Sequence, residues 1–308
     1  MTRGPSYVIT CFLVAFVFLP ATRVQAERAL GVDVSQWQLD MNWETAYDQG
    51  IRFAFVRSSR GGTTPGTGKI IDERFYENMQ EIDALAAQGK KLYAGAYHFG
   101  RWDTIGPVVN SATITAHARD QAQHFYDIAG AYMTPGYLRP VLDLEQDSNP
   151  DRSTPPLSKA QLSLWVNTMM DHVETLSGVE PLIYTNTNFA TEKVDASVNH
   201  RDLWIARWSN PADPLTDNPE TTVPYPNPYG VWNDPIGSTV ASHDVWSFWQ
   251  YTVAWGQGAT YGAGSDAIDL DVANGDLNFV RSFLVPEPVT APLVAGLVLL
   301  LSRRRRRV

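Results

Sequence analysis

Short apolar runs alternate with longer polar segments of helical period along most of the chain, and this alternation constrains the fold more than any other feature. It is typical of repeated strand-helix units built around a parallel sheet. The predicted strands cover residues 29–34, 53–58, 91–97, 140–145, 181–186, 203–207, 245–251 and 267–270. Eight such strands predict a closed barrel, and no linker or repeat divides it.

The predicted helices have clear start and stop signals. Helical period is strongest over residues 72–88, 115–129 and 158–176. Ser158 and Gln161 can form a capping box, while Gly89 and Gly178 follow helix ends as stops. No such helix follows the fifth predicted strand, and residues 210–244 are rich in proline, asparagine and aspartate, as in a long loop or insertion. We therefore expect an α/β barrel that is irregular in its last third.

Residues 1–26 have the composition of a secretory signal peptide. Arg3 precedes an apolar run over residues 7–19, and small residues lead up to Glu27. That run has about a dozen residues, whereas a membrane-spanning helix needs about 20. We expect a signal peptidase to remove this segment together with Cys11, the only cysteine of the chain. The exported protein would then form no disulfide and no thiolate metal site.

Residues 285–308 combine Val-Pro-Glu-Pro, an apolar stretch over 289–301 and five arginines at 303–307. This order resembles a PEP-CTERM sorting segment, which an exosortase recognises and removes in the cell envelope. An arginine run is also typical of a nucleic-acid contact, but the apolar helix directly before it disfavours that interpretation. The two ends together predict export to the periplasm, the cell surface or the medium, with transient inner-membrane anchoring left open.

The central residues 27–284 are strongly acidic. Removing Arg3, Arg23 and the five terminal arginines from the 24 basic residues leaves 17, and removing Glu287 from the 33 acidic ones leaves 32. A net charge of about -15 argues against nucleic-acid binding. It also gives no long-range attraction to an anionic polymer, so such binding has to be local. We expect this segment to be one domain and a monomer.

Two carboxylates share one face of the strand predicted over 140–145. Side chains alternate along a strand that rises about 3.3 Å per residue, so Asp143 and Glu145 project together, roughly 7 Å apart, while Leu142 and Leu144 point into the helix layer. Two carboxyl groups in an apolar barrel repel each other, which raises the pKa of one of them and yields a general acid. A strand that simply ends in solvated acids would have the same sequence.

Two further acids support the functional interpretation. Asp33 and Asp269 end the first and last predicted strands. In a parallel barrel all such ends converge at one mouth, where the active sites of these folds are built. Four acids far apart in sequence are therefore expected to meet in one pocket.

Aromatic residues lie on or just past the same strand ends, namely Trp37, Tyr97, Tyr184, Trp208, Trp249 and Tyr251. Flat sugar faces stack well on aromatic rings, although any single one of these rings could belong to the core. His98 could line the pocket or cap a loop. No histidine pair has the helical spacing of a zinc site, and the glycine-rich residues 61–68 lack the lysine of a phosphate loop. The sequence predicts a carbohydrate cleft without a metal or cofactor.

Eight stretches in order resemble the glycoside hydrolase family 25 lysozymes. They are GVDVSQWQ from 31, FAFVRSSRG from 53, GAYHF from 95, PVLDLEQ from 140, LIYTN from 182, LWIARW from 203, FWQYT from 248 and IDLDVANGD from 268. The resemblance spans about residues 29–283. It implies an α/β fold of the irregular TIM-like (β/α)5(β)3 barrel type over the catalytic segment 27–284.

The resemblance also implies roles for single residues. Glu145 would be the general acid and base and Asp143 its partner. Asp33 and Asp269 match acids that hold the sugar and tune this pair, and Tyr97 matches a substrate-contacting tyrosine. Other expected substrate contacts are Tyr184, Trp208, Trp249, Trp37 and Asp271. The family often has asparagine where Asp271 stands, so this site is expected to be more acidic. It commonly has tyrosine where Trp208 stands.

The expected activity is cleavage of the β-1,4 bond between N-acetylmuramic acid and N-acetylglucosamine in peptidoglycan glycan strands. Whether Asp143 attacks directly or orients the substrate's acetamido group as nucleophile stays open. One alternative is a barrel that binds cell walls without turnover. Another is a chitinase-like hydrolase, although the upstream aspartates of that signature are missing around Arg139 and Leu142.

Overall fold

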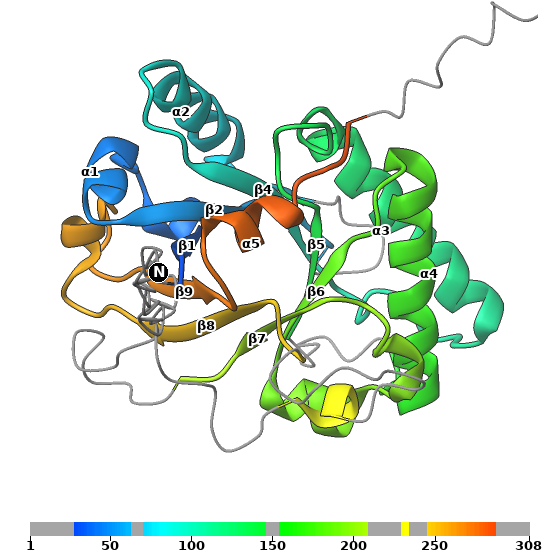
Figure 1. The fold of residues 1–308 in the computed structure, drawn as a ribbon. Helices are drawn as coiled ribbons and strands as arrows, with labels where there is room; N and C mark the ends of the chain where they lie inside the picture. The colour runs from blue at the N-terminus through cyan, green and yellow to red at the C-terminus, as the bar shows by residue number, and fades with distance from the viewer. Residues whose placement is uncertain (1–27, 63–69, 146–153, 209–228, 234–244, 288–308) are drawn as a thin grey trace, which may run out of the picture.

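The computed structural model describes residues 28–62, 70–145, 154–208, 229–233 and 245–287, and within them eight strands close into a barrel (Figure 1). The strands are β1 (Leu30–Val34), β2 (Ile51–Arg60), β4 (Tyr93–Phe99), β5 (Val141–Leu144), β6 (Leu182–Asn186), β7 (Leu203–Ala206), β8 (Phe248–Val253) and β9 (Asp269–Ala273). Their order is β1-β9-β8-β7-β6-β5-β4-β2, and a β1–β2 pairing closes the ring. A two-residue strand, β3 (Ile70–Ile71), pairs with the end of β2. The fold confirms the predicted TIM-like barrel.

The last strand corrects the expectation of a wholly parallel barrel. Strand β9 runs antiparallel to both β1 and β8, whereas the other barrel strands pair in parallel. Asp269 therefore begins its strand instead of ending it. Because the first residues of an antiparallel strand lie beside the last residues of its neighbours, Asp269 still pairs with Asp33 at the same mouth.

Helices cover the outside of β1 to β5 (Figure 1). They are α1 (Trp43–Asp48), α2 (Phe75–Ala87), α3 (Ser111–Ala129) and α4 (Lys159–Ser177). The predicted capping box is confirmed, because the Ser158 side chain accepts from the Gln161 backbone and the Gln161 side chain accepts from the Ser158 backbone. Gly178 ends α4 with a φ of 73°, a conformation that glycine adopts without the steric cost of a Cβ atom. Within the described ranges, no α-helix follows β7 or β8.

The barrel separates two apolar clusters, as side-chain alternation requires. Leu142 and Leu144 face the helices, while Phe55 and Trp204 stack inside the barrel with ring centroids 4.4 Å apart. Gly31 leaves room for this interior, because a Cβ atom there would lie 2.3 Å from the Phe53 ring.

A fifth helix, α5 (Leu277–Ser282), lies across one end of the barrel (Figure 1). Val280 of α5 and Phe283 just after it pack with Phe53 and Tyr93, which lie near the starts of their strands. The helix therefore closes the amino-terminal end of the parallel strands. The opposite end is left open for the cleft.

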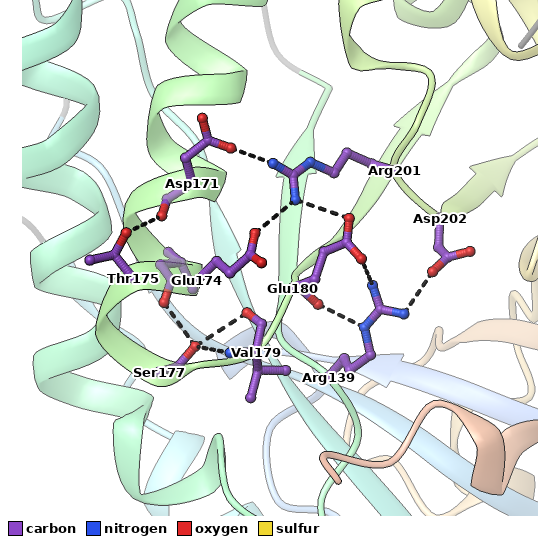
Figure 2. A network of polar contacts seen from close by, with 10 residues as sticks. Arg139, Asp171, Glu174, Thr175, Ser177, Val179, Glu180, Arg201 and Asp202 are labelled. Atoms are coloured by element: carbon purple, nitrogen blue, oxygen red, sulfur yellow. Dashed lines mark hydrogen bonds and ion pairs between the residues drawn. The ribbon is translucent and has the colours of Figure 1, made fainter. Parts of the chain in front are cut away.

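Two arginines join α4 to the starts of β6 and β7 (Figure 2). Arg201 forms ion pairs with Asp171, Glu174 and Glu180. Arg139 forms ion pairs with the second carboxylate oxygen of Glu180 and with Asp202. Its Nε also donates to the Glu180 carbonyl at 2.7 Å. The carboxylates are partly exposed, so each pair contributes little to the free energy of unfolding, and the network mainly fixes how α4 meets the sheet.

Several sequence expectations fall outside the described residues. They concern the signal peptide over 1–26, the sorting segment beyond residue 287, most of the loop 61–68 and all of the insertion 210–244 except 229–233. Each stays a prediction. Among the helices that the structure does describe, none has the length and apolar character needed to cross a bilayer.

Candidate active site

A cleft of about 950 Å³ lies at the carboxyl ends of the parallel strands, opposite α5. The four acids predicted to meet, Asp33, Asp143, Glu145 and Asp269, all line it. Four of the predicted sugar contacts, Trp37, Tyr97, Tyr184 and Trp208, line it as well. Strands β1, β5 and β9 therefore bring together acids that are more than a hundred residues apart in sequence.

Asp143 lies on β5 and Glu145 directly follows that strand, and both carboxyl groups line the cleft. Burial first, and then the charges of Glu145 and Asp33, raise the pKa of Asp143 well above its ordinary value, and its Oδ1 is buried without a hydrogen-bond partner. Burial also raises the pKa of Glu145, while the Tyr184 hydroxyl and the Arg57 guanidinium oppose that rise. Because both carboxyls cannot ionise cheaply here, protonation of one of them is favoured above the usual carboxyl range.

Gln250 on β8 connects the aromatic side of the cleft to the acids. Its Nε2 donates to Asp33 Oδ2 at 2.8 Å, and its Oε1 accepts from Trp208 Nε1 at 3.1 Å. The Tyr184 hydroxyl lies 3.1 Å from the same Oε1 and 3.4 Å from Glu145 Oε2. Asp33, Glu145 and two sugar-binding candidates are thus held in one hydrogen-bond network.

Asp271 lies beneath this network and does not line the cleft, so the structure does not bear out a direct substrate contact. Its side chain is fully buried, and its Oδ1 accepts from Trp204 Nε1 at 2.8 Å. Its Oδ2 is buried without a hydrogen-bond partner. Burial, followed by the charge of Asp269, raises the pKa of Asp271 well above its ordinary value. Asp271 is therefore a buried group that holds the Trp204 indole in place inside the barrel.

We expect Asp271→Asn to stabilise the protein at neutral pH. A carboxyl group with a raised native pKa contributes full stability below its unfolded pKa of about 3.9 and loses it as pH rises toward the native value. An amide keeps the shape of the side chain without titrating. The free energy of unfolding of the variant should therefore exceed that of the wild type by about 1–3 kcal/mol at pH 7, and this difference should vanish near pH 3. Urea unfolding of both proteins at these two pH values measures it. Equal differences at both pH values would contradict the raised pKa of Asp271.

Trp249 is a correction to the predicted substrate contacts. Its side chain is fully buried in the helix-facing cluster, and its Nε1 donates to the Arg207 carbonyl at 2.7 Å. Tyr251 also belongs to that cluster. Neighbouring residues of a strand point to opposite faces, and the inward residues of β8 are Phe248 and Gln250. The sequence marked the right strand but the wrong face.

His98 does not line the cleft. It is fully buried, and its Nδ1 lies 2.8 Å from Ser59 Oγ. Its Nε2 lies 3.1 Å from Gln121 Oε1 on α3. The histidine therefore connects the barrel to the helix layer.

Sequence reasoning missed several residues of the cleft wall, namely Gln250, Arg57, Arg60, Arg101 and Trp255. Gln250 could have been found, since it stands inward between two outward aromatic residues in FWQYT. The arginines gave no comparable signal, because a charged residue at a strand end is usually solvated. Among the described residues, no group of three or more His, Cys, Asp or Glu side chains is arranged to hold a metal ion.

Comparison with known proteins finds lysozymes and muramidases that are similar to this chain. Lysozyme M1 of Streptomyces globisporus is 26% identical over 237 residues, which cover 75% of this chain and 64% of that protein. The N,O-diacetylmuramidase of Chalaropsis sp is 28% identical over 181 residues, covering 57% of this chain and 76% of that one. The solved bacterial lysozyme of Streptomyces coelicolor shares the fold with a TM-score of 0.57 at 24% identity, over 83% of this chain and 97% of the other.

The family model described as Glycosyl hydrolases family 25 matches residues 32–257. The match begins inside β1, includes the three acids Asp33, Asp143 and Glu145, and ends after β8. It covers more than half of the sequence, and the chain belongs to glycosyl hydrolase family 25.

Proposed function

We propose that this protein is a lysozyme-type hydrolase that cleaves the β-1,4 bond between N-acetylmuramic acid and N-acetylglucosamine in peptidoglycan. The observation that carries the proposal is the buried carboxyl pair Asp143 and Glu145 in a cleft lined by aromatic rings. Acids and aromatic faces are what sugar hydrolysis needs, and the related lysozyme and muramidases support the choice of polymer. Export and removal of both ends, by a signal peptidase and an exosortase, belong to this proposal.

In this proposal Glu145 donates its proton to the departing glycosidic oxygen and later accepts one from the attacking water. The Tyr184 hydroxyl near Glu145 Oε2 keeps that carboxyl in position. A substrate acetamido N–H that donates to Asp143 favours the ionised form of that residue, which leaves the proton with Glu145. Asp143 thereby orients the acetamido oxygen for attack on the sugar carbon, and no metal or cofactor takes part.

The proposal is tested by incubating the purified full chain with bacterial cell walls and, in parallel, with chitin. We expect the turbidity of the wall suspension to fall while chitin releases no soluble sugar. A wall-binding module would sediment with the walls and leave the turbidity unchanged. Release of sugar from chitin at a similar rate would favour the chitinase-like alternative.

The raised pKa of the carboxyl pair sets the direction of the pH dependence. A general acid works in its protonated form, so kcat/KM should fall as pH rises through the raised pKa of the pair, above the usual carboxyl value of about 4.3. Asp143→Asn removes the neighbouring charge, so the falling limb of its residual activity should move to lower pH. A limb that stays in place in Asp143→Asn would contradict the coupling.

A further inference from the structure

One wall of the cleft is basic, although the body of the protein is strongly acidic. Arg57, Arg60 and Arg101 line the cleft from the end of β2 and from the segment that follows β4. Strands β2 and β4 are parallel neighbours in which Arg60 pairs with Phe99, two residues before Arg101. A Cβ atom on Gly61 would lie 2.6 Å from Arg101 Cβ, so the two chain segments are in close contact at this point.

Two of these arginines are neutralised by buried carboxylates. Arg57 Nε donates to Asp72 Oδ2 at 2.7 Å, and both side chains are buried. Asp72 is itself fixed by the backbone N–H groups of Gln36 and Arg74. Arg101 forms a two-point contact with Asp103, through Nε at 2.9 Å and through Nη2. These pairs hold two guanidinium groups rigidly in the wall.

Arg60 differs from its two neighbours. It is only partly buried, and over the described part of the chain its guanidinium forms neither an ion pair nor a hydrogen bond. Burial, followed by the charges of Arg57 and Arg101, lowers its pKa, although arginine stays protonated at any working pH. The Asp72 carboxylate, already paired with Arg57, offsets part of the positive charge that Arg60 presents to the cleft, and an anionic ligand would relieve the rest.

The position of Arg60 indicates which part of a substrate it can reach. It lies beyond Arg57 along β2, and because a bulge falls between Arg57 and Ser59, it advances by two residues of β4, roughly 7 Å toward the rim. Arg57, in contrast, is close enough to the acid pair to oppose the rise of both pKa values. Arg60 thus faces a substituent of the sugar chain and not the bond that the acids attack.

We propose that Arg60, backed by Arg57 and Arg101, forms a subsite for a carboxylate carried by the glycan. This proposal rests on the proposed function. In peptidoglycan the muramic acid bears a lactyl ether that ends in a carboxyl group, either free or amide-linked to a short acidic peptide. A guanidinium group pairs with carboxylate through two parallel hydrogen bonds, and the surrounding negative body makes such a local contact the means of holding an anionic polymer.

The test compares three forms of one glycan preparation: with its peptides, stripped of them by an amidase so that the lactyl carboxylate is free, and with all carboxylates converted to amides. Arg60→Gln should lower kcat/KM about tenfold on the carboxylate-bearing forms, mainly through KM, and leave the amidated form unchanged. Arg60→Lys should retain most of the activity. Arg119→Gln, an exposed arginine on α3 outside the cleft wall, is the matched control and should be unaffected.

The pattern of losses identifies the source of the carboxylate. A loss confined to the peptide-bearing glycan assigns the subsite to the peptide, and a loss confined to the stripped glycan assigns it to the lactyl group. An equal loss on the amidated glycan, or no loss on any form, overturns the subsite while the proposed function stands.

A binding measurement separates the subsite from hydrolysis. Calorimetry with a Glu145→Gln protein compares muramyl dipeptide and N-acetylmuramic acid, each with its amidated form. The ligand whose carboxylate is recognised should give a Kd about tenfold lower than its amidated form, and the addition of Arg60→Gln should remove this difference. If the wild type hydrolyses none of the glycans but this difference is present, the proposed function fails and the subsite stands. Equal affinity for the charged and amidated forms of both ligands overturns the subsite.

Discussion

Glu145→Gln should lower kcat on cell walls by about 10³-fold while KM stays within a few fold of the wild-type value. The amide keeps the shape of the side chain and its contact with the Tyr184 hydroxyl, but it has no proton to give to the departing oxygen. Removing a titrating group in this way affects the transition state and not the binding of the substrate. Steady-state kinetics on soluble glycan fragments measure both constants.

The matched control for this prediction is Glu192→Gln. Glu192 is exposed on the short helix Phe189–Lys193 and does not line the cleft, so the same chemical change there should leave kcat unchanged. Thermal unfolding should give the same Tm for Glu145→Gln as for the wild type, or a higher one, because burial raises the pKa of the native carboxyl. A folded Glu145→Gln protein with wild-type kcat would remove Glu145 from the reaction.

Trp204→Ala should lower the free energy of unfolding by about 3–5 kcal/mol. Trp204 is buried at the centre of the barrel, stacked on Phe55 and tilted against Tyr184, with both ring centroids 4.4 Å from its own. Its indole N–H is also the donor to the buried Asp271 Oδ1. The substitution therefore opens a large cavity and leaves a buried acceptor without its partner.

Two further variants separate these contributions. Trp204→Phe keeps most of the ring but deletes the N–H, so it should cost about 1–3 kcal/mol. Trp255→Ala removes a tryptophan that is 65% exposed and should change stability by less than about 0.5 kcal/mol. Guanidinium unfolding of the three variants measures these changes, provided that the dependence of the free energy of unfolding on denaturant concentration stays the same. A Trp204→Ala protein as stable as the wild type would show that the barrel interior does not depend on this stack.

The sequence predicted the barrel well because its strands are short, apolar and separated by helix signals, and these are local properties. The capping box at Ser158 and the αL residue Gly178 confirm the predicted start and end of α4. The direction of β9 was not a local property. It follows from how the chain re-enters the ring between β1 and β8, and strand sequences carry no mark of direction.

The site was predicted less evenly than the fold. The placement of Asp33, Asp143, Glu145 and Asp269 around the cleft agrees with the prediction, because acids at strand ends converge whichever way the last strand runs. For the aromatic residues, the prediction depended on which face of the strand each side chain occupies. Trp249 and Gln250 are neighbours on β8, and only Gln250 points inward and lines the cleft.

The basic wall was also beyond sequence reasoning. Nothing in the chain marks Asp72 and Asp103 as the partners of Arg57 and Arg101, or Arg60 as an arginine that pairs with no carboxylate among the described residues.

The most direct test of the central claim is mass analysis of the sugar ends that the full chain releases from defined peptidoglycan. The digest is reduced with borohydride, so that the newly formed reducing sugar is labelled. Cleavage after N-acetylmuramic acid, assisted by Glu145, predicts that reduced muramic acid terminates every new fragment and that Glu145→Gln yields almost none. Fragments that end in reduced glucosamine, or walls left uncut by a folded wild-type protein, would contradict the account.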